Sequence, residues 1–406
     1  MLIGATGTEV RMGEPLSGSV AAADAPRFLV RRHATLDKLA PLWRDWQEAG
    51  AVGAYQRLEW VELLLAHLGG PARARPLFLE VREAAGDRPV MILPLVLRWR
   101  RGLRRLAFLD LMVCDYAAPL LAPDRELSPA EAEAAFAAIR AVLPKADLLE
   151  ITRIPATVGG RPNPLAHLAR HRPIAMTSSG IAIEGEAETL LRRLMSASAF
   201  KDLGKRRRRL ERAGTLRFER AATPEAVERT FAALVEQRRR RFGEMGRFDL
   251  LARPEVLAFY RDAALLGLSS GAARLFGLWV DETPVAAAYG LVHGGAFHGL
   301  LLTLSGDEAW RNASPGLQIV GECLRWSRAE GLDYFDFTIG DLPYKRDFGT
   351  EPRALGEIAL PLTPAGRIAL GAARLREAAM RRLGEHPAAH ARLQKARRLA
   401  RRLGIG

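Results

Sequence analysis

The stretch from Ala272 to Phe348 constrains the fold most, because three apolar, β-rich runs follow one another there with only short turns between them. The runs span Leu275–Val280, Val285–Val292 and Phe297–Leu304. Short, Gly- or Pro-containing turns between such runs are typical of β-hairpins, so the pattern predicts an antiparallel meander.

A helix is expected directly after the meander, opened by Ser314-Pro315-Gly316. Ser314 suits an N-cap, Pro315 suits the first helical position, and Gly316 would let a ligand approach the backbone. Free amides and the positive end of the helix dipole suit a diphosphate, which predicts binding by residues Ser314, Pro315, Gly316, Leu317 and Gln318. The stretch has neither GxxxxGK[ST] nor GxGxxG, so a P-loop and a Rossmann fingerprint are excluded.

A fourth strand is expected at Tyr334–Ile339, with a single acid, Asp336, among aromatic residues. A carboxylate in that setting is costly unless it is paired or functional, and desolvation would raise its pKa towards the range of a general base. A structural acid bonded to amides or to an arginine is the other interpretation. Asp341, in the loop after the strand, is an equally weighted candidate base.

The order and spacing of several short motifs resemble the GNAT N-acyltransferases, and among them the FemAB-like branch that includes the BioF2-like, CelD-type acetyltransferases. The resemblance covers roughly residues 30 to 362 and is strongest from about 190 to 350. Its motifs are Ser314-Pro315-Gly316, Phe335-Asp336-Phe337, Gly340-Asp341, Tyr344-Lys345 and Phe348-Gly349. It implies a tandem fold and an acyl-CoA donor, with acetyl favoured.

The same resemblance implies roles for Tyr344 and Lys345. Lys345 would stabilise negative charge on the acyl oxygen or hold an anionic acceptor, and Tyr344 would protonate the leaving thiolate. A solvated loop lysine is the alternative for Lys345. Relatives carry an arginine where Ile339 precedes Gly340, which leaves open any acceptor contact made from that position.

Five further residues are expected to contact the substrate, although for His298 a satisfied core histidine is the favoured interpretation. They are Tyr289, His298, Arg241, Asp115 and Tyr116. The histidines show no HExxH or other metal-ligand spacing, so no metal site is expected.

The order of elements repeats in the first part of the chain, with paired strands, a third strand, a Ser-Pro helix start and an apolar strand containing one acid. There Ser128-Pro129 corresponds to Ser314-Pro315 and Glu150 corresponds to Asp336, and Ser128 with Glu131 predicts a capping box. We therefore expect an α/β (α+β) fold of two GNAT-like halves, each a mostly antiparallel mixed sheet flanked by helices.

The expected division of the chain follows from this repeat. Residues 1–26 form a disordered N-terminus, and 27–172 a degenerate half that shapes the acceptor groove. Residues 173–365 form the acyltransferase half, and 366–406 a basic amphipathic helical tail.

The net charge of +14 is concentrated in that tail, where ten Arg and one Lys against Glu377 and Glu385 give +9. The pattern fits a helix on anionic lipid or on an acidic partner, or a solvated helix. The basic run Lys205–Arg209 favours a solvated helix face over tRNA, and no DNA binding is expected. No long apolar run and no secretory signal are seen, and Cys114 and Cys323 are not expected to pair.

The sequence thus predicts a cytoplasmic, acyl-CoA-dependent N- or O-acyltransferase, with a peripheral position at the inner face of the membrane as an option. The acceptor is expected to be a small molecule or a sugar, such as an exopolysaccharide or envelope precursor. Two alternatives stay open: an aminoacyl-tRNA donor as in FemX-like transferases, and a non-catalytic binding or assembly subunit.

Overall fold

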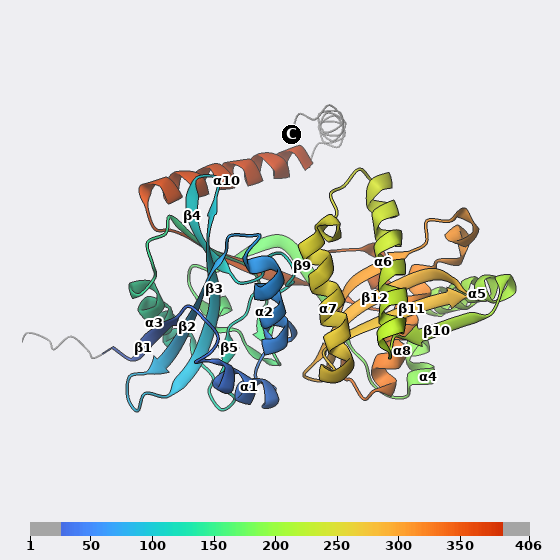
Figure 1. The fold of residues 1–406 in the computed structure, drawn as a ribbon, viewed down its shortest axis with the longest axis horizontal. Helices are drawn as coiled ribbons and strands as arrows, with labels where there is room; N and C mark the ends of the chain where they lie inside the picture. Colours follow the sequence, from blue (N-terminus) through green and yellow to red (C-terminus); the bar gives the residue numbers. More distant parts are fainter. Residues whose placement is uncertain (1–25, 385–406) are drawn as a thin grey trace, which may run out of the picture.

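The structure, a computed structural model, describes residues 26–384 and is built around one sheet of thirteen strands (Figure 1). The strands from one edge to the other are β1 (Phe28–His33), β2 (Arg75–Glu83), β3 (Pro89–Arg100), β4 (Leu103–Phe108), β6 (Leu148–Ile154), β15 (Glu351–Pro361), β9 (Arg172–Ala182), β14 (Tyr334–Ile339), β13 (Ala296–Leu304), β12 (Thr283–His293), β11 (Ala273–Val280) and β10 (Leu216–Arg220). Short β5 (Leu120–Leu121) pairs with β3, and β7 (Thr157–Val158) with β8 (Arg161–Pro162) forms a separate ribbon.

The N-terminal half starts with the antiparallel strands β1 to β4 and ends with a parallel crossover. From β4 the chain passes through α3 (Pro129–Ala141) and returns as β6, parallel to β4. Ser128 and Glu131 form the predicted capping box at the start of α3.

The C-terminal half repeats this order. Strands β10 to β13 are antiparallel, the chain passes through α8 (Pro315–Ala329), and β14 returns parallel to β13. The predicted meander is β11, β12 and β13, and the predicted fourth strand is β14 with the same bounds. The expected fold class, with tandem mixed sheets, is confirmed.

Strands β9 and β15 join the two halves into one sheet. β15 follows the C-terminal half in sequence, yet it pairs with β6 on one side and with β9 on the other, and β9 then pairs with β14. The expected boundary between residues 172 and 173 falls at the start of β9. The last strand of the C-terminal half, β15, is hydrogen-bonded to β6 of the N-terminal half.

Helices cover both faces of the C-terminal half. α6 (Pro224–Glu244) and α7 (Pro254–Ser270) pack on one face against Tyr289 and Leu291 of β12. α4 (Ala187–Leu194), α5 (Ala197–Ala213) and α8 pack on the other face against Ala286 and Ala288. The alternation along β12 is the period of a strand buried on both faces.

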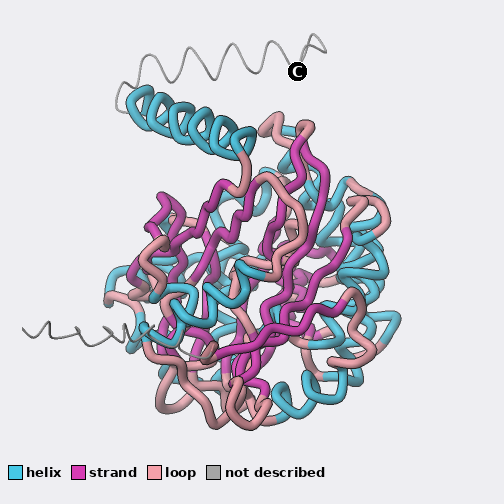
Figure 2. The backbone as a smooth tube through the Cα atoms, turned by 90° about the vertical axis from the view of Figure 1, so that its left-hand side faces the viewer, coloured by secondary structure: helices cyan, strands magenta, loops and turns pink. Residues whose placement is uncertain are grey.

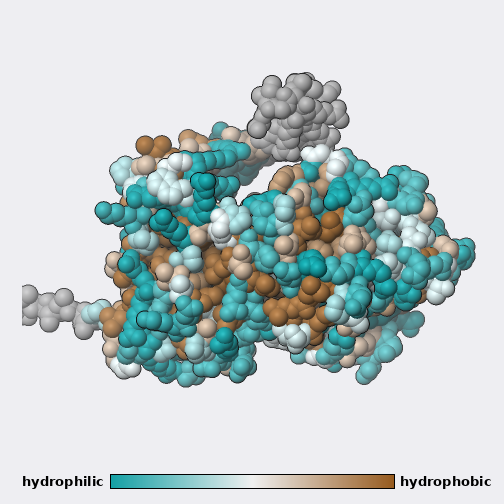
Figure 3. All heavy atoms as spheres, viewed as in Figure 1, coloured by the Kyte–Doolittle hydropathy of each residue, from teal (hydrophilic) through white to brown (hydrophobic). Residues whose placement is uncertain are grey.

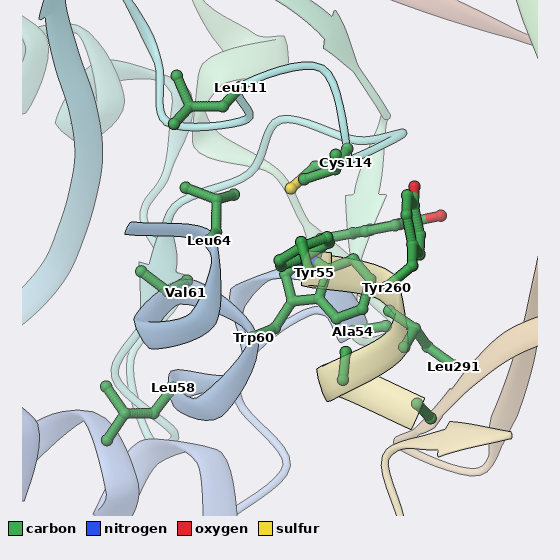
Figure 4. Packing of buried hydrophobic residues seen from close by; sticks show 14 of the residues in the cluster. Ala54, Tyr55, Leu58, Trp60, Val61, Leu64, Leu111, Cys114, Tyr260 and Leu291 are labelled. Carbon is green, nitrogen blue, oxygen red and sulfur yellow. The ribbon is translucent and has the colours of Figure 1, made fainter. Parts of the chain in front are cut away.

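The first of these cores also contains side chains of the N-terminal half, from α1 (Ala40–Glu48) and α2 (Leu58–Leu64). Figure 4 shows Trp60 of α2 facing Tyr260 of α7, with ring centroids 6.0 Å apart. The two halves therefore share one continuous apolar core as well as one sheet.

The last described helix, α10 (Pro364–Gly384), lies at one end of the molecule, where it contacts β6 and β15 (Figure 2). The expected disordered N-terminus falls almost entirely outside the described residues, and so does the tail from residue 385 onward. Within residues 26–384, no helix is both long and apolar enough to span a bilayer.

Candidate active site

The parallel strands β13 and β14 separate beyond a short paired stretch. Only three residue pairs join them, from Ala296↔Tyr334 to His298↔Asp336, although β13 continues to Leu304 and β14 to Ile339. Thr338 on β14 has φ 57°, a left-handed conformation that bends the strand away and that non-glycine residues seldom adopt. The backbone of β13 past His298 thus faces an open wedge.

A cavity of about 650 Å³, the wedge cavity, fills this opening. Its walls are apolar residues of β13 and β14 such as Leu302 and Phe337, together with the start of α8 and the loop after β14. Gly316 and Tyr344 line it together. The two places that the sequence expects to hold the donor therefore share one cavity.

The start of α8 differs from the expected N-cap. Ser314 lies in the left-handed region with φ 48° and makes no side-chain cap, so the predicted capping role is wrong. Its Oγ instead accepts a hydrogen bond from Arg206 Nη1 at 2.6 Å. The Leu317 amide donates to the Ser314 carbonyl at 3.0 Å, whereas the Gly316 amide has no backbone partner within the described part of the chain.

The predicted anion-binding set is therefore smaller than expected. Ser314, Pro315, Gly316 and Leu317 line the wedge cavity. Gln318 does not: its amide nitrogen donates to the Leu203 carbonyl at 2.8 Å in the core between α8 and α5. Position 318 lies one turn into the helix on its buried side. Its side chain therefore packs in the core, and the predicted contact of Gln318 with the diphosphate is wrong.

Arginines add positive charge to the wedge cavity. Arg238 and Arg241 of α6 and Arg311 line it. Arg238 is held by Asp249 at 2.6 Å, while Arg241 is exposed and makes no ion pair with any residue in 26–384. An unpaired guanidinium near a free helix amide suits an anionic ligand.

Lys345 is buried, with 3% of its surface exposed. Its Nζ donates to the carbonyls of Phe337, Thr338 and Ile339 at 2.8, 3.1 and 3.1 Å. These contacts engage all three N–H donors of an ammonium, and burial lowers the pKa of Lys345. Lys345 therefore holds the bent end of β14, and no donor is left over for the expected acyl oxygen.

Tyr344 keeps the expected position. It lines the wedge cavity beside Phe337, with ring centroids 6.5 Å apart. Burial raises the pKa of Tyr344 to about 12, so its hydroxyl carries a proton at neutral pH.

A second cavity of about 470 Å³, the interface cavity, lies between the halves and is lined by Asp336, His298 and Tyr116. Asp336 Oδ1 accepts from the Tyr116 hydroxyl at 2.9 Å and from the Thr338 amide at 2.7 Å. Asp336 Oδ2 lies 3.0 Å from His298 Nδ1. Three residues from distant parts of the sequence thus form one hydrogen-bonded group.

Asp115 contacts this group indirectly, through Tyr55. The Tyr55 hydroxyl lies 3.3 Å from Asp115 Oδ2, and burial raises the pKa of Asp115. The Tyr55 ring contacts the rings of Tyr116 and His298 edge-on, with centroids 5.7 and 6.2 Å apart. Tyr55 therefore fixes the tyrosine and histidine that flank Asp336.

Comparison with known proteins agrees with the observed fold. Residues 197–346 match the family model described as an acetyltransferase (GNAT) domain. The solved structure of FemX matches 82% of this chain and 97% of its own, with 12% identity and a TM-score of 0.54. Residues 197–346 therefore carry a GNAT-type acetyltransferase domain, and the chain has a fold similar to that of FemX.

Two further solved structures match with TM-scores below 0.5. A conserved protein of unknown function from Bacteroides thetaiotaomicron VPI-5482 gives 0.48 at 11% identity, covering 82% of this chain and 100% of its own. The C-terminal domain of a putative lysylphosphatidylglycerol synthetase from Agrobacterium fabrum gives 0.47 at 13% identity, covering 83% and 96%. No curated protein matches the sequence.

Two expected site residues are bonded to structural partners. Asp341 is a surface residue paired with Arg346 at 2.7 Å, and it lines neither the wedge nor the interface cavity. Tyr289 lies at the wall of the wedge cavity, but it is fully buried and its hydroxyl donates to the Tyr260 carbonyl at 3.2 Å. An aspartate and a tyrosine are residue types that occur in active sites, but here their side chains bond to Arg346 and to the Tyr260 carbonyl.

Other residues of the interface cavity carry no sequence signal. Arg353 of β15 lies over the Tyr334 ring, 5.4 Å from its centroid, and both line the cavity. Ser179 Oγ and His293 Nε2 also border it, buried and without a hydrogen-bond partner among the described residues. Ser179 and Arg353 lie on β9 and β15, the strands that join the two halves, whereas His293 and Tyr334 belong to β12 and β14.

Proposed function

We propose that this acyltransferase transfers an acyl group, acetyl in the favoured case, from CoA in the wedge cavity to an amine or hydroxyl acceptor in the interface cavity. One observation carries the proposal: consecutive residues of the same two strands line the two cavities. His298 and Asp336 border the interface cavity, while Gly299 and Phe337 border the wedge cavity.

The wedge cavity fits the chemistry of acyl-CoA. Its apolar walls suit the acyl chain and the thioester. The edge of β13 beyond Gly299 pairs with no strand of the described residues on the side of β14, and it offers hydrogen bonds to the pantetheine amides, as an added strand would use them. The free Gly316 amide and Arg241 suit the diphosphate.

The proton leaves the acceptor through His298 in this proposal. With Nδ1 donating to Asp336, the Nε2 of His298 is an acceptor, and Asp336 stabilises the imidazolium that forms. The acceptor nitrogen or oxygen attacks the thioester carbon, and the carbon–sulfur bond breaks. Tyr344 then donates its proton to the departing thiolate.

Calorimetric titration with acetyl-CoA and an assay of thiol release test this assignment. We expect Tyr344→Phe to bind acetyl-CoA like the wild type and to turn over about 10–100-fold more slowly on a primary-amine acceptor. Absence of acetyl-CoA binding by the intact wild type would refute the donor.

An aminoacyl-tRNA donor is the second candidate, favoured by the position of α5. Arg206 contacts Ser314, and Arg209 Nη1 donates to the Asn312 carbonyl at 2.5 Å, so the basic run lies beside the start of α8. Filter binding of charged tRNA should then weaken steeply with salt and be lost in Arg208→Gln together with Arg212→Gln. The sugar or envelope acceptor remains a prediction from the resemblance. The cytoplasmic location remains a prediction from the two cysteines that are not expected to pair.

A further inference from the structure

One end of the molecule combines exposed apolar side chains with unpaired arginines, and it lies outside both cavities. It consists of α10 and the tip of the β3–β4 hairpin, residues 98–105, and we name it the basic end. Figure 3 shows apolar atoms among hydrophilic ones along the upper edge of the molecule, where Figure 1 places α10.

The outer face of α10 is apolar at its centre. Ile368 and Leu375 are each 75% exposed, and their spacing of seven residues places them on one face, two turns apart. The opposite face is attached to the body through buried Leu370 and through Glu377, which pairs with Arg172 at 3.3 Å. The apolar stripe therefore points away from the protein.

The hairpin tip exposes the largest apolar side chain of this end. Trp99 is 70% exposed, and the guanidinium carbon of Arg104 lies 5.9 Å from its ring centroid. Arg100 and Arg101 follow it at the turn, both exposed. An exposed tryptophan beside arginines is typical of side chains that sit at a membrane–water interface.

Asp147 fastens these two elements together. Its Oδ2 accepts from the Arg104 amide at 2.8 Å, and its Oδ1 accepts from Thr363 Oγ1 at 2.9 Å, just before α10. A Cβ on Gly366 would lie 1.7 Å from the Asp147 carbonyl oxygen, so only glycine lets the helix start this close. The hairpin tip and α10 thus form one rigid surface.

The charge of the basic end is not neutralised by the protein. Seven exposed arginines of this surface make no ion pair with any residue in 26–384: Arg100, Arg101, Arg367, Arg374, Arg376, Arg381 and Arg382. Arginines around an exposed aliphatic stripe favour an anionic bilayer, because a nucleic acid would gain little from Ile368 and Leu375.

We propose that the basic end binds the surface of an anionic lipid bilayer, with Trp99, Ile368 and Leu375 inserted at the level of the headgroups. This surface extends beyond the tail that the sequence singled out, since it includes the hairpin of the N-terminal half. It does not depend on the donor or acceptor assigned above.

Co-flotation of the full chain with vesicles tests the proposal. We expect binding to vesicles of phosphatidylglycerol and phosphatidylcholine and little binding to phosphatidylcholine alone, with a loss at high salt. Trp99→Ala and the double variant Ile368→Gln/Leu375→Gln should each lower the partition coefficient about tenfold. Phe248→Ala is the matched control, because Phe248 is 68% exposed but lies outside the basic end.

Each variant should keep wild-type circular dichroism and wild-type acetyl-CoA binding, because its side chain is exposed. Equal flotation of the wild type and the variants would overturn the proposal, as would a wild type that binds neither vesicle. Loss of tRNA binding in Trp99→Ala, without vesicle binding by the wild type, would assign the surface to nucleic acid instead.

Discussion

The two parallel crossovers of the molecule, β4–α3–β6 and β13–α8–β14, are built alike but end differently. In each, a Ser-Pro pair opens the helix and three residue pairs join the parallel strands. The third pair holds the acid in both cases, Ala107↔Glu150 in one half and His298↔Asp336 in the other.

The helix starts show the first difference. In the N-terminal half Ser128 and Glu131 satisfy each other's amides, and Arg125 lowers the pKa of Glu131 to about 2. In the C-terminal half Ser314 is turned into a left-handed conformation, which leaves the Gly316 amide free at a cavity. The amides at the helix N-terminus are therefore capped by side chains in the N-terminal half, whereas the corresponding end of α8 leaves the Gly316 amide uncapped at the cavity.

The acids show the second difference. Glu150 forms an ion pair with Arg105 at 2.7 Å, whereas Asp336 is bonded to His298, Tyr116 and Thr338 at the interface cavity. A duplicated strand position thus carries a structural acid in one half and a group suited to chemistry in the other.

Replacement of each acid by its amide should give the largest difference in activity between the two halves. We expect Asp336→Asn to lower kcat about 10³-fold, because the orientation of His298 and the stabilisation of its imidazolium are lost. Glu150→Gln is the matched control and should stay within about twofold of the wild type. Equal losses in a thiol-release assay would show that the two positions do not differ in function.

Both returning strands have a left-handed residue near their end, Arg153 with φ 62° on β6 and Thr338 with φ 57° on β14. On β14, Lys345 should hold the bend. Lys345→Met leaves three carbonyls without their donor, so we expect about 3 kcal/mol lower unfolding free energy in urea. Arg346→Met removes only an exposed pair with Asp341 and should cost less than about 0.5 kcal/mol. Unchanged stability of Lys345→Met combined with a loss of turnover would indicate that Lys345 acts in the reaction and does not hold the strand.

The seam between the halves should be sensitive to acid through His293. Its Nδ1 lies 3.2 Å from Arg57 Nη1, and burial, with Arg57, lowers the pKa of His293 to about 4. Between pH 6.5 and 4 the unfolded histidine binds a proton that the folded one does not, so stability falls as the pH falls.

We expect this histidine to contribute up to about 3 kcal/mol of lost unfolding free energy between pH 7 and pH 4. The contribution is the difference between the wild type and His293→Gln in urea titrations at both pH values. Parallel pH profiles for the two proteins would contradict it.

A bulky side chain at the N-terminus of α8 should block the donor site that α8 has and α3 lacks. Gly316→Trp places a ring in the wedge cavity, and we expect acetyl-CoA binding to weaken about 100-fold by calorimetry. Ala130→Trp, at the exposed corresponding position of α3, should leave binding unchanged. Unchanged binding in Gly316→Trp would separate the cavity from the donor.

The smallest effect should distinguish the two serines. Ser128→Ala removes a cap and should cost about 1 kcal/mol of unfolding free energy. Ser314→Ala removes no cap and should cost less than half as much. Equal costs in thermal unfolding would mean that Ser314 stabilises its helix after all.

The sequence by itself determined the local elements and their order. The meander, the strand at Tyr334–Ile339, the capping box at Ser128 and the repeated order of the two halves follow from short-range periodicity and turn chemistry, which act within a few residues. The order and spacing of the motifs from Ser314 to Gly349 supported the resemblance to GNAT acyltransferases.

Only the tertiary structure decided which groups meet. Tyr116 donates a hydrogen bond to Asp336, 220 positions away in the sequence, and β15 pairs with a strand of the other half. Lys345 donates to three backbone carbonyls. Strand partners and side-chain donors are chosen by the pairing and packing of the whole sheet, and no local pattern encodes that choice.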